Sequence, residues 1–483
     1  MNFISTQFVI FMLVTWGLFL VLPPRYRWQM LLAASYVFYA TWSIPFVAVI
    51  LLTTSVDYLA SKILYANASP QFRKMTLWTA IVVNLLVLGY FKYFNFFLDI
   101  NASLLKYLGV ANTMPKHLEI LLPLGISYYT FEAISYLLDV YRGAKPAPNW
   151  LSYNFYIMYF PHLISGPIVR FNELWPQYKD GIQNPAFARV GKGLELLVLG
   201  YMFKLIIADN CAGIADPVFA KPEAATVLGT YTAVLAFAGQ LYFDFLGYTH
   251  IARGASLMFN LQLPINFNHP LNADNMADFW KRWQISLSRW LHDYLYVPLG
   301  GSRKYLPRTM LNVFITLMVA GIWHGAGWIY VVLGLYFGVN VAGYHAWRRL
   351  RKKLFKTKDK VIVNHPLYVC AAHIVTFTLI VLSGVFFRST SVQNELVVFD
   401  HLIRFKKLFE EIAAAARVDN FTEVGICLSM IVILISGPYV VRLYERLYQP
   451  MPYWVKLQTA TAALLLCWIF CAEYIPPFIY FQF

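Results

Sequence analysis

Charged residues are scarce in this sequence. Asp, Glu, Lys and Arg make up 13% of the 483 residues, whereas apolar residues make up 59%. A soluble chain of this length could not hide so many apolar side chains behind so few charges. The composition therefore excludes a soluble globular protein and predicts an all-α chain that crosses a membrane many times.

Cysteine is also rare, and no two cysteines have the CxxC spacing. The five are Cys211, Cys370, Cys427, Cys467 and Cys471. Most lie in apolar segments, where a thiol behaves as a small apolar side chain. We therefore expect neither a disulfide framework nor a metal site.

Internal repeats and low-complexity linkers are absent as well. The lack of a repeat argues against a transporter built from inverted repeats. The lack of a linker predicts a single membrane-embedded domain that comprises residues 1–483.

Basic residues gather in short loops between the apolar runs. The net charge is +15, but no nucleic-acid-binding motif accompanies it. Such bases orient a membrane chain and contact anionic headgroups, so we expect membrane lipids and no nucleic acid as partners. The predicted cytoplasmic bases are Arg25 and Arg27, Arg73 and Lys74, Arg142 and Lys145, and those within 281–308 and 348–360. Arg25 and Arg27 follow the first apolar run rather than precede it. This order predicts that the run is a retained membrane span and that the N-terminus of the chain lies outside.

The apolar runs predict about eleven or twelve membrane passes, since one pass needs about 20 apolar residues. Two runs, 30–64 and 309–347, are long enough for two short crossings or a re-entrant pair. Residues 150–308 differ, because Pro, Gly and polar residues interrupt stretches such as FPHLISGPIVRF and FNLQLPINFNHPLNA. Irregular backbone cannot face lipid, so these stretches must be buried, line a watery cavity or lie at the interface.

An imidazole stands in the middle of the second long run. Residues 309–347 contain no Lys, Arg, Asp or Glu, and His324 lies there in the stretch GIWHGAGW. A buried neutral imidazole can take a proton from a hydroxyl near neutral pH. The flanking glycines permit close approach of backbone or substrate. From these facts alone, a structural or gating histidine fits as well as a catalytic one.

The stretch DFWKRWQISLSRWLHDYLYVPLGG, residues 278–301, has the profile of an interfacial amphipathic helix. As one helix it would place Trp280, Leu287 and Leu291 on a single stripe with Gln284 among them. An amide on such a stripe points inward and must find a hydrogen bond. Glu132 and Asp244 are further ionisable groups in apolar segments, and buried hydrogen bonding between helices explains them as simply as a functional role.

Together these stretches resemble the membrane-bound O-acyltransferase superfamily, in particular its bacterial branch of alginate O-acetylation and teichoic-acid D-alanylation membrane proteins. The resemblance runs in order over nearly the whole chain. Its blocks are ISYYTFEAISYLLDVYRG, YFPHLISGPIVRF, MFKLIIADN, LYFDFLGYTHIARG, LPINFNHP, FWKRWQISLSRWLHDYLYVPLGGSRK, GIWHGAGW and PPFIYFQF.

The resemblance implies a ring of transmembrane helices around a funnel, with short re-entrant and interfacial helices. It also implies that His324 is the catalytic histidine. Gln284 stands where this branch usually carries a second histidine, and we expect it to assist catalysis by hydrogen bonding. We further expect Trp323, Trp280, Arg282, Ser288 and Asp244 to bind substrate.

The implied activity is an O-acetyltransferase in the bacterial inner membrane. It would move an acetyl group from a cytoplasmic thioester, with acetyl-CoA as donor substrate and no bound cofactor, toward an extracytoplasmic polysaccharide. Alginate, cellulose and peptidoglycan are the expected acceptors, and a periplasmic serine-esterase-like acetyltransferase is the expected partner. Two alternatives remain: aminoacyl or acyl transfer from a carrier protein, and a polysaccharide or lipid-linked sugar transporter or channel.

Overall fold

The computed structural model describes residues 1–67, 69–109, 117–180, 182, 187–303, 305–389, 391–417, 422–472 and 476–479. These residues form helices, turns and loops, and the described part of the chain contains no strand. The predicted all-α class is therefore confirmed. Lys304 of the predicted cytoplasmic bases and residues 480–483 of the block PPFIYFQF lie outside the described residues.

Within the described ranges, seven helices are long and apolar enough to cross a membrane, and α1 (Thr6–Val21) is a shorter apolar helix. A polytopic membrane protein is thus confirmed. Other predicted passes fall in shorter helices, such as the 16 residues of α6 (Ile126–Tyr141), so the total of eleven or twelve stays a prediction. The seven are Ile44–Ala66, Pro70–Tyr107, Leu306–His324, Trp328–Phe355, Pro366–Arg388, Thr422–Tyr448 and Tyr453–Phe470.

Both unusually long apolar runs are divided into helix pairs. The run 30–64 falls in α2 (Pro24–Ala40) and α3 (Ile44–Ala66). The run 309–347 falls in α15 (Leu306–His324) and α16 (Trp328–Phe355). The second interruption places His324 at the end of a helix rather than in its middle.

The described residues group into two compact units. The first contains 1–197, 249–264 and 325–327, and the second contains 198–248, 265–324 and 328–483. This grouping does not test the prediction of a single domain, and the ring and funnel implied by the resemblance also stay predictions.

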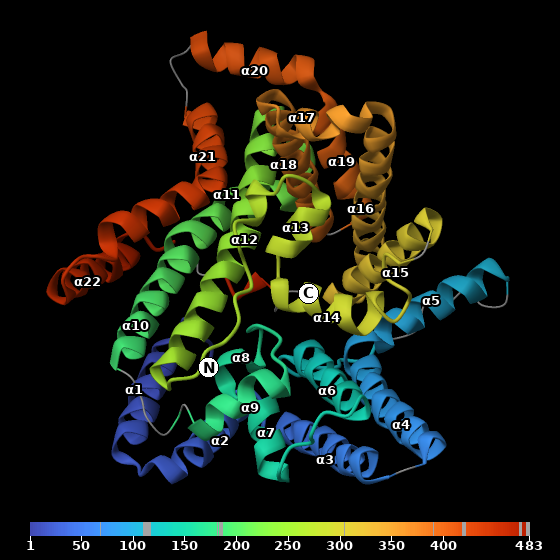
Figure 1. Ribbon diagram of the computed structural model, residues 1–483. Helices are drawn as coiled ribbons and strands as arrows, with labels where there is room; N and C mark the ends of the chain where they lie inside the picture. The colour runs from blue at the N-terminus through green and yellow to red at the C-terminus, as the bar shows by residue number, and fades with distance from the viewer. Residues whose placement is uncertain are drawn as a thin grey trace. The chain divides into compact units, whose positions relative to one another are not determined.

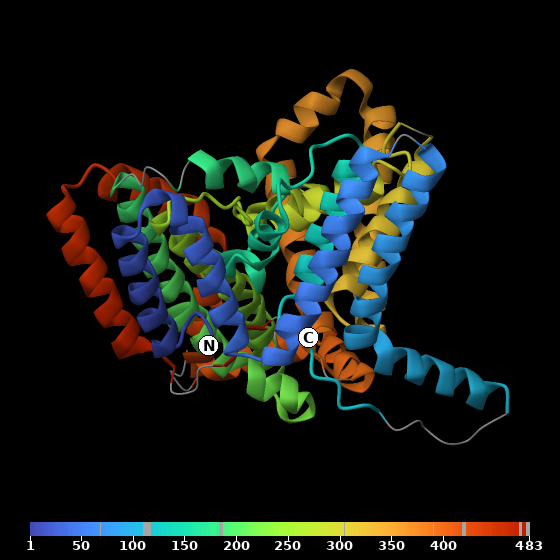
Figure 2. The ribbon, with the colours of Figure 1, turned by 90° about the horizontal axis from the view of Figure 1, so that it is seen from below.

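The first unit contains the N-terminal helices, drawn in blue and cyan in Figures 1 and 2. Besides α1, α2, α3 and α6, it holds α4 (Pro70–Leu88), α5 (Phe94–Tyr107), α7 (Trp150–Met158), α8 (Phe160–Leu163), α9 (Phe171–Asp180) and the start of α10 (Phe187–Tyr201). Its interior is rich in aromatic side chains, among them the fully buried Tyr153, Tyr156 and Tyr159. The short α7, α8 and α9 confirm that residues 150–180 do not form a regular span.

Ionisable groups buried in the first unit have partners. Oε1 of Glu132 lies 3.2 Å from Nδ1 of His162 and accepts a hydrogen bond from the backbone N–H of Val169 at 3.0 Å. Oδ1 of Asp57 accepts a bond from Asn84 at 2.7 Å. These contacts support the structural interpretation of Glu132, because each carboxylate joins separate segments of the unit.

The second unit begins with the end of α10 and the π-helix Met202–Ala208, followed by α11 (Asp209–Ala220) and α12 (Val227–Met258) up to residue 248. It continues with α13 (Met276–Arg282), α14 (Ile285–Leu291), α15 and α16. It ends with α17 (Asp359–Asn364), α18 (Pro366–Arg388), α19 (Val392–Ile403), α20 (Phe405–Arg417), α21 (Thr422–Leu443) and α22 (Tyr453–Phe470).

A buried ion pair connects distant parts of the second unit. Nζ of Lys204 lies 2.7 Å from Asp209 and 3.1 Å from Asp244. Asp244 also accepts a hydrogen bond from the backbone N–H of Ile479 at 2.8 Å, and Lys204 donates to the carbonyl of Pro476 at 3.1 Å. The pair therefore attaches the end of the chain to α12.

Helices α15 and α16 are in backbone contact, and they lie side by side in Figures 1 and 2. A Cβ on Gly321 would lie 2.5 Å from the carbonyl oxygen of Tyr330 and 2.6 Å from the Cα of Gly334. Only glycine at position 321 allows this approach. The contact is one turn from His324 and therefore sets where the imidazole lies.

We predict that Gly321→Ala destabilises the protein by ~1–3 kcal/mol, because backbone atoms cannot yield to the added methyl group. The measurement is the apparent melting temperature in detergent. Gly343→Ala in α16 is the matched control, since a Cβ there meets nothing within 4 Å. Equal melting temperatures for the two variants would contradict the predicted contact.

Candidate functional site

His324 is the last residue of α15 and is 4% exposed. The centroid of its ring lies 5.1 Å from that of Trp323 and 5.2 Å from that of Phe387, both in edge-on arrangements. Aromatic rings on two sides restrict the orientation of the imidazole. The predicted burial of His324 is therefore confirmed.

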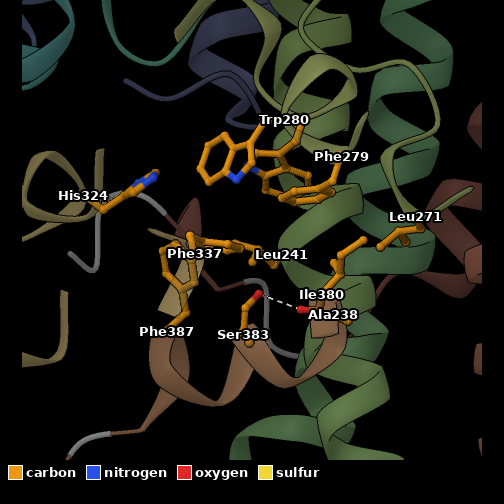
Figure 3. Close-up of a pocket in the computed structure, with 12 residues that line it drawn as sticks. Ala238, Leu241, Leu271, Phe279, Trp280, His324, Phe337, Ile380, Ser383 and Phe387 are labelled. Atoms are coloured by element: carbon orange, nitrogen blue, oxygen red, sulfur yellow. Dashed lines mark hydrogen bonds between the residues drawn. The ribbon is translucent and has the colours of Figure 1, made fainter. Parts of the chain in front are cut away.

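The imidazole lines a narrow cavity within the second unit. Its walls come from α12, α13, α16, α18 and the loops beside them, and Figure 3 shows the imidazole pointing toward the indole of Trp280. The volume of about 20 Å³ has room for one water molecule. The lining residues are Ala238, Leu241, Leu271, Phe279, Trp280, Trp283, His324, Phe337, Ile380, Ser383, Gly384 and Phe387.

Few polar groups face this cavity. The hydroxyl of Ser383 donates to the carbonyl of Ile380 at 2.6 Å, which leaves its oxygen able to accept a further bond. The indole N–H of Trp280 is buried and has no hydrogen-bond partner among the described residues. An imidazole between apolar walls can bind a hydroxyl and take its proton, and the cavity has room for only one competing water molecule.

The segment that precedes the cavity is broken, so the prediction of one continuous helix over 278–301 was wrong. Helix α13 ends at Arg282 and α14 begins at Ile285. Between them Gln284 adopts the left-handed conformation, with φ of 39°. A residue other than glycine is strained in this region and persists only where its surroundings impose it.

Gln284 is fully buried, at 0% exposure, which confirms that its side chain points inward. The hydrogen bond expected for it is not found, because neither amide atom has a partner among the described residues. Leaving a buried amide unsatisfied costs about 1–3 kcal/mol per group. Gln284 does not line the His324 cavity in this state of the protein. Strain and an unsatisfied amide at one residue are the features expected of a functional site.

The remaining predicted site residues divide into two groups. Trp280 shares the cavity of His324, and Trp323 packs against its ring. Arg282 instead pairs with Asp278 at 2.7 Å, and the hydroxyl of Ser288 donates to the carbonyl of Trp283 at 3.2 Å. Asp244 has the partners described above, and substrate binding by all five of these residues stays a prediction.

A second, wider cavity of about 510 Å³ is also lined by Trp280, so this indole contributes to the walls of both cavities. The basic side chains that line the wider cavity include Lys281, His345 and Arg348, and Ser288 is among its other lining residues. Asp274 and Asp278 also line it.

Sequence reasoning missed the contribution of α18 to the His324 cavity, namely Ile380, Ser383, Gly384 and Phe387. The available signal was the pair Ser383–Gly384, two small residues within the apolar run of that helix. Among the residues that the structure describes, no three His, Cys, Asp or Glu side chains form a group that could hold a metal ion.

Comparison with known proteins gives consistent matches. The sequence model described as "MBOAT, membrane-bound O-acyltransferase family" matches residues 111–386. The "Probable alginate O-acetylase AlgI" of Azotobacter vinelandii is 40% identical over 351 residues, which cover 72% of this chain and 69% of that protein. The "Peptidoglycan O-acetyltransferase" of Helicobacter pylori is 32% identical over 79% of this chain and 74% of its own. The "Teichoic acid D-alanyltransferase" of Lacticaseibacillus rhamnosus is 29% identical over 63% of this chain and 82% of that protein.

The unsatisfied amide of Gln284 generates a prediction about stability. Gln284→Met removes both polar atoms at nearly constant volume, so we expect the melting temperature to stay equal or to rise. Asn266→Leu is the contrasting variant, because Oδ1 of Asn266 accepts the backbone N–H of Ser286 at 3.2 Å in a buried position.

For Asn266→Leu we expect a loss of about 1–3 kcal/mol, since that N–H would be left without its acceptor. Apparent melting temperatures in one detergent compare the two variants. A larger loss for Gln284→Met than for Asn266→Leu would show that the glutamine amide supports the fold.

Proposed function

This chain belongs to the membrane-bound O-acyltransferase family, and from that membership we propose that it moves an acetyl group from a cytoplasmic acetyl-CoA toward hydroxyls of an extracytoplasmic polysaccharide. The protein is a multi-pass membrane O-acyltransferase. The observation that carries the finer proposal is the position of His324, which ends α15 inside a nearly dry cavity.

In the proposed reaction His324 acts as general base. Its unprotonated ring nitrogen takes the proton of an acceptor hydroxyl, and the oxygen attacks the thioester carbonyl. The C–S bond breaks, the thiolate leaves, and the imidazolium returns the proton to the sulfur. A transient acetyl group on the imidazole is the other route open to the same residue. A base of this kind accelerates transfer by about 10²- to 10⁴-fold.

Gln284 supplies hydrogen bonds in this proposal. Its amide has both a donor and an acceptor that the described residues leave unused. Such an amide can orient the thioester carbonyl or the acceptor hydroxyl without itself transferring a proton. This explains how glutamine could serve where the bacterial branch usually has histidine.

The cavity must widen for the reaction. A volume of about 20 Å³ holds one water molecule, so an acetyl group does not fit beside His324 in this state. Trp280 lines both this cavity and the wider one, so a rotation of its indole would join them. We propose that the acetyl thioester reaches His324 from the wider cavity in this way.

The wider cavity suits the donor. Lys281 and Arg348 provide cationic groups for the phosphates of coenzyme A, and both belong to segments that the sequence predicts to be cytoplasmic. Part of the wall is apolar, as at Val313, Leu317 and Val341, and the carboxylates of Asp278 and Asp274 lie 2.7 Å from Arg282 and 2.8 Å from His373. A pantetheine chain and its thioester could lie along such a surface.

For the acceptor we propose an exopolysaccharide such as alginate or cellulose, or peptidoglycan. Support comes from two relatives, which are named a probable alginate O-acetylase and a peptidoglycan O-acetyltransferase. Transfer to a polymer outside the bacterial inner membrane would be completed by a periplasmic serine-esterase-like partner. Aminoacyl transfer from a carrier protein is the second candidate, since a D-alanyltransferase is also a relative, but its identity of 29% is lower than the 40% of the alginate relative. The comparisons name no transporter or channel among the relatives described above.

We predict that His324→Ala reduces incorporation of labelled acetyl groups into the cell's polysaccharide by at least about 10²-fold, because the general base is lost. The measurement is radiolabel or mass spectrometry of purified polymers at matched protein levels. His365→Ala is the control, because His365 is an exposed residue before α18 and lines neither cavity. Undiminished incorporation in the His324 variant would refute the proposal.

We further predict that Lys281→Gln and Arg348→Gln each raise the KM for acetyl-CoA by about ten-fold, the equivalent of one charge-assisted hydrogen bond of ~1.5 kcal/mol. The kcat should change little, since neither residue lines the His324 cavity. Lys360→Gln, at an exposed position of α17, is the matched control for lost charge. A fall in kcat at unchanged KM would contradict donor binding in this cavity. If the protein binds an acyl carrier protein saturably and does not bind acetyl-CoA, the donor is the acyl carrier protein instead.

A further inference from the structure

A third cavity lies in the first unit, away from every residue used above. It measures about 470 Å³ and opens beside the start of α10 and the end of α12. Its polar lining consists of Arg189, Lys192, Arg253 and Gln262, and no carboxylate is among the lining residues. Leucines, among them Leu257 and Leu263, form the rest of the wall.

Two glycines bring these basic side chains together. A Cβ on Gly193 of α10 would lie 2.8 Å from the carbonyl oxygen of Gly254, and a Cβ on Gly254 of α12 would lie 2.6 Å from that of Gly193. The two backbones therefore touch where the long side chains of Lys192 and Arg253 begin. Lys192 and Arg253, each next to one of these glycines, both line the cavity.

Among the described residues, the two arginines have few hydrogen-bond partners. Arg253 donates only Nε–H, to the carbonyl of Leu263 at 3.4 Å, and has no carboxylate partner among the described residues. Arg189 donates Nη1–H to the backbone and side-chain oxygens of Asn260, at 3.3 and 3.0 Å. A partly buried guanidinium without a counter-ion is unfavourable, and its planar donors match phosphate oxygens in geometry.

The wall holds the arginines in place. Asn260, which positions Arg189, has φ of 64° and is 5% exposed. The backbone of Gln262 exchanges hydrogen bonds with the amide of Gln177 in α9, at 2.8 and 3.2 Å. The strained Asn260 and the loop fixed by Gln177 form one wall of the cavity, which Arg189 and Lys192 reach from exposed positions on α10.

A contact of Arg27 points to the predicted cytoplasmic side for this cavity. Nη1 of Arg27 donates to the carbonyl of Ile182, in the segment that leads into α10, at 3.1 Å. Arg27 is among the bases that the sequence predicts to be cytoplasmic. Anionic phospholipids present phosphates at the cytoplasmic surface of a membrane, and basic pockets between helices bind their headgroups.

We propose that this cavity binds the phosphodiester headgroup of an anionic phospholipid from the cytoplasmic leaflet, with Arg189 and Arg253 contacting the phosphate. Lys192 adds long-range attraction while it pairs with Glu195 at 3.0 Å. The leucines of the wall contact the glycerol and the first methylenes of the acyl chains. The site is independent of the acetyl-transfer proposal, because it shares no residue with either cavity of the second unit.

The test uses the full-length protein in nanodiscs that contain phosphatidylcholine and phosphatidylglycerol. Native mass spectrometry of the released protein measures how strongly it retains phosphatidylglycerol over phosphatidylcholine. We expect the preference to fall about 5-fold in Arg189→Gln or Arg253→Gln and about 25-fold in the double variant, the equivalent of ~1 kcal/mol per charge. Lys74→Gln, an exposed base of α4 on the same predicted side, should leave the preference unchanged.

Two further measurements distinguish a lost lipid site from a loss of folding or of charge. In pure phosphatidylcholine the double variant and the wild type should melt at the same temperature, and added phosphatidylglycerol should stabilise only the wild type. Arg253→Lys, which keeps the charge, should retain part of the preference. Equal retention by wild type and double variant would overturn the site. Displacement of the lipid by millimolar acetyl-CoA or inorganic phosphate, in wild type but not in the double variant, would overturn the lipid assignment in favour of a soluble phosphate compound.

Discussion

In a bilayer, polar groups of the chain must find their partners within the protein, because hydrocarbon offers none. This constraint explains most of the polar interior of this molecule. Asp57 meets Asn84, Glu132 meets His162, and Lys204 lies between Asp209 and Asp244. Each of these groups joins segments that are distant in the sequence, so the demand for partners contributes directly to the fold.

The same constraint makes polar groups that lack a partner within the described residues informative about function. Gln284 is fully buried and strained, yet its amide has no partner in the described part of the protein. Arg253 presents donors to a cavity with no carboxylate in its wall. Keeping polar groups without partners lowers the stability of the fold, which points to a ligand that meets them. Substrate in the first case and a lipid phosphate in the second would supply the missing partners.

The sequence predicted the fold class, the division of both long apolar runs and the irregular middle of the chain, because these depend on hydropathy, Gly and Pro, which are local properties. It also singled out His324, since an ionisable ring in a run without charges is visible without a structure. It failed at Trp283 and Gln284, where helical periodicity continues across a break that tertiary contacts impose: the carbonyl and side chain of Asn266 accept the N–H groups of Ile285 and Ser286. The wall from α18 was also missed, because an apolar helix does not show in its sequence which of its faces meets a histidine.

The aromatic cavity around His324 balances two requirements of acyl transfer in a membrane. Water near the base would hydrolyse the thioester, which favours the narrow space of about 20 Å³ between Trp280, Phe337 and Phe387. The donor and acceptor must nevertheless enter, which requires that part of the wall can move. The backbone contact of Gly321 with α16 fixes the base, whereas Trp280 lines both cavities and has no hydrogen bond from its indole N–H to hold it among the described residues. A fixed histidine beside a movable tryptophan would allow the site to stay dry at rest and to open toward the donor only when the donor displaces the indole.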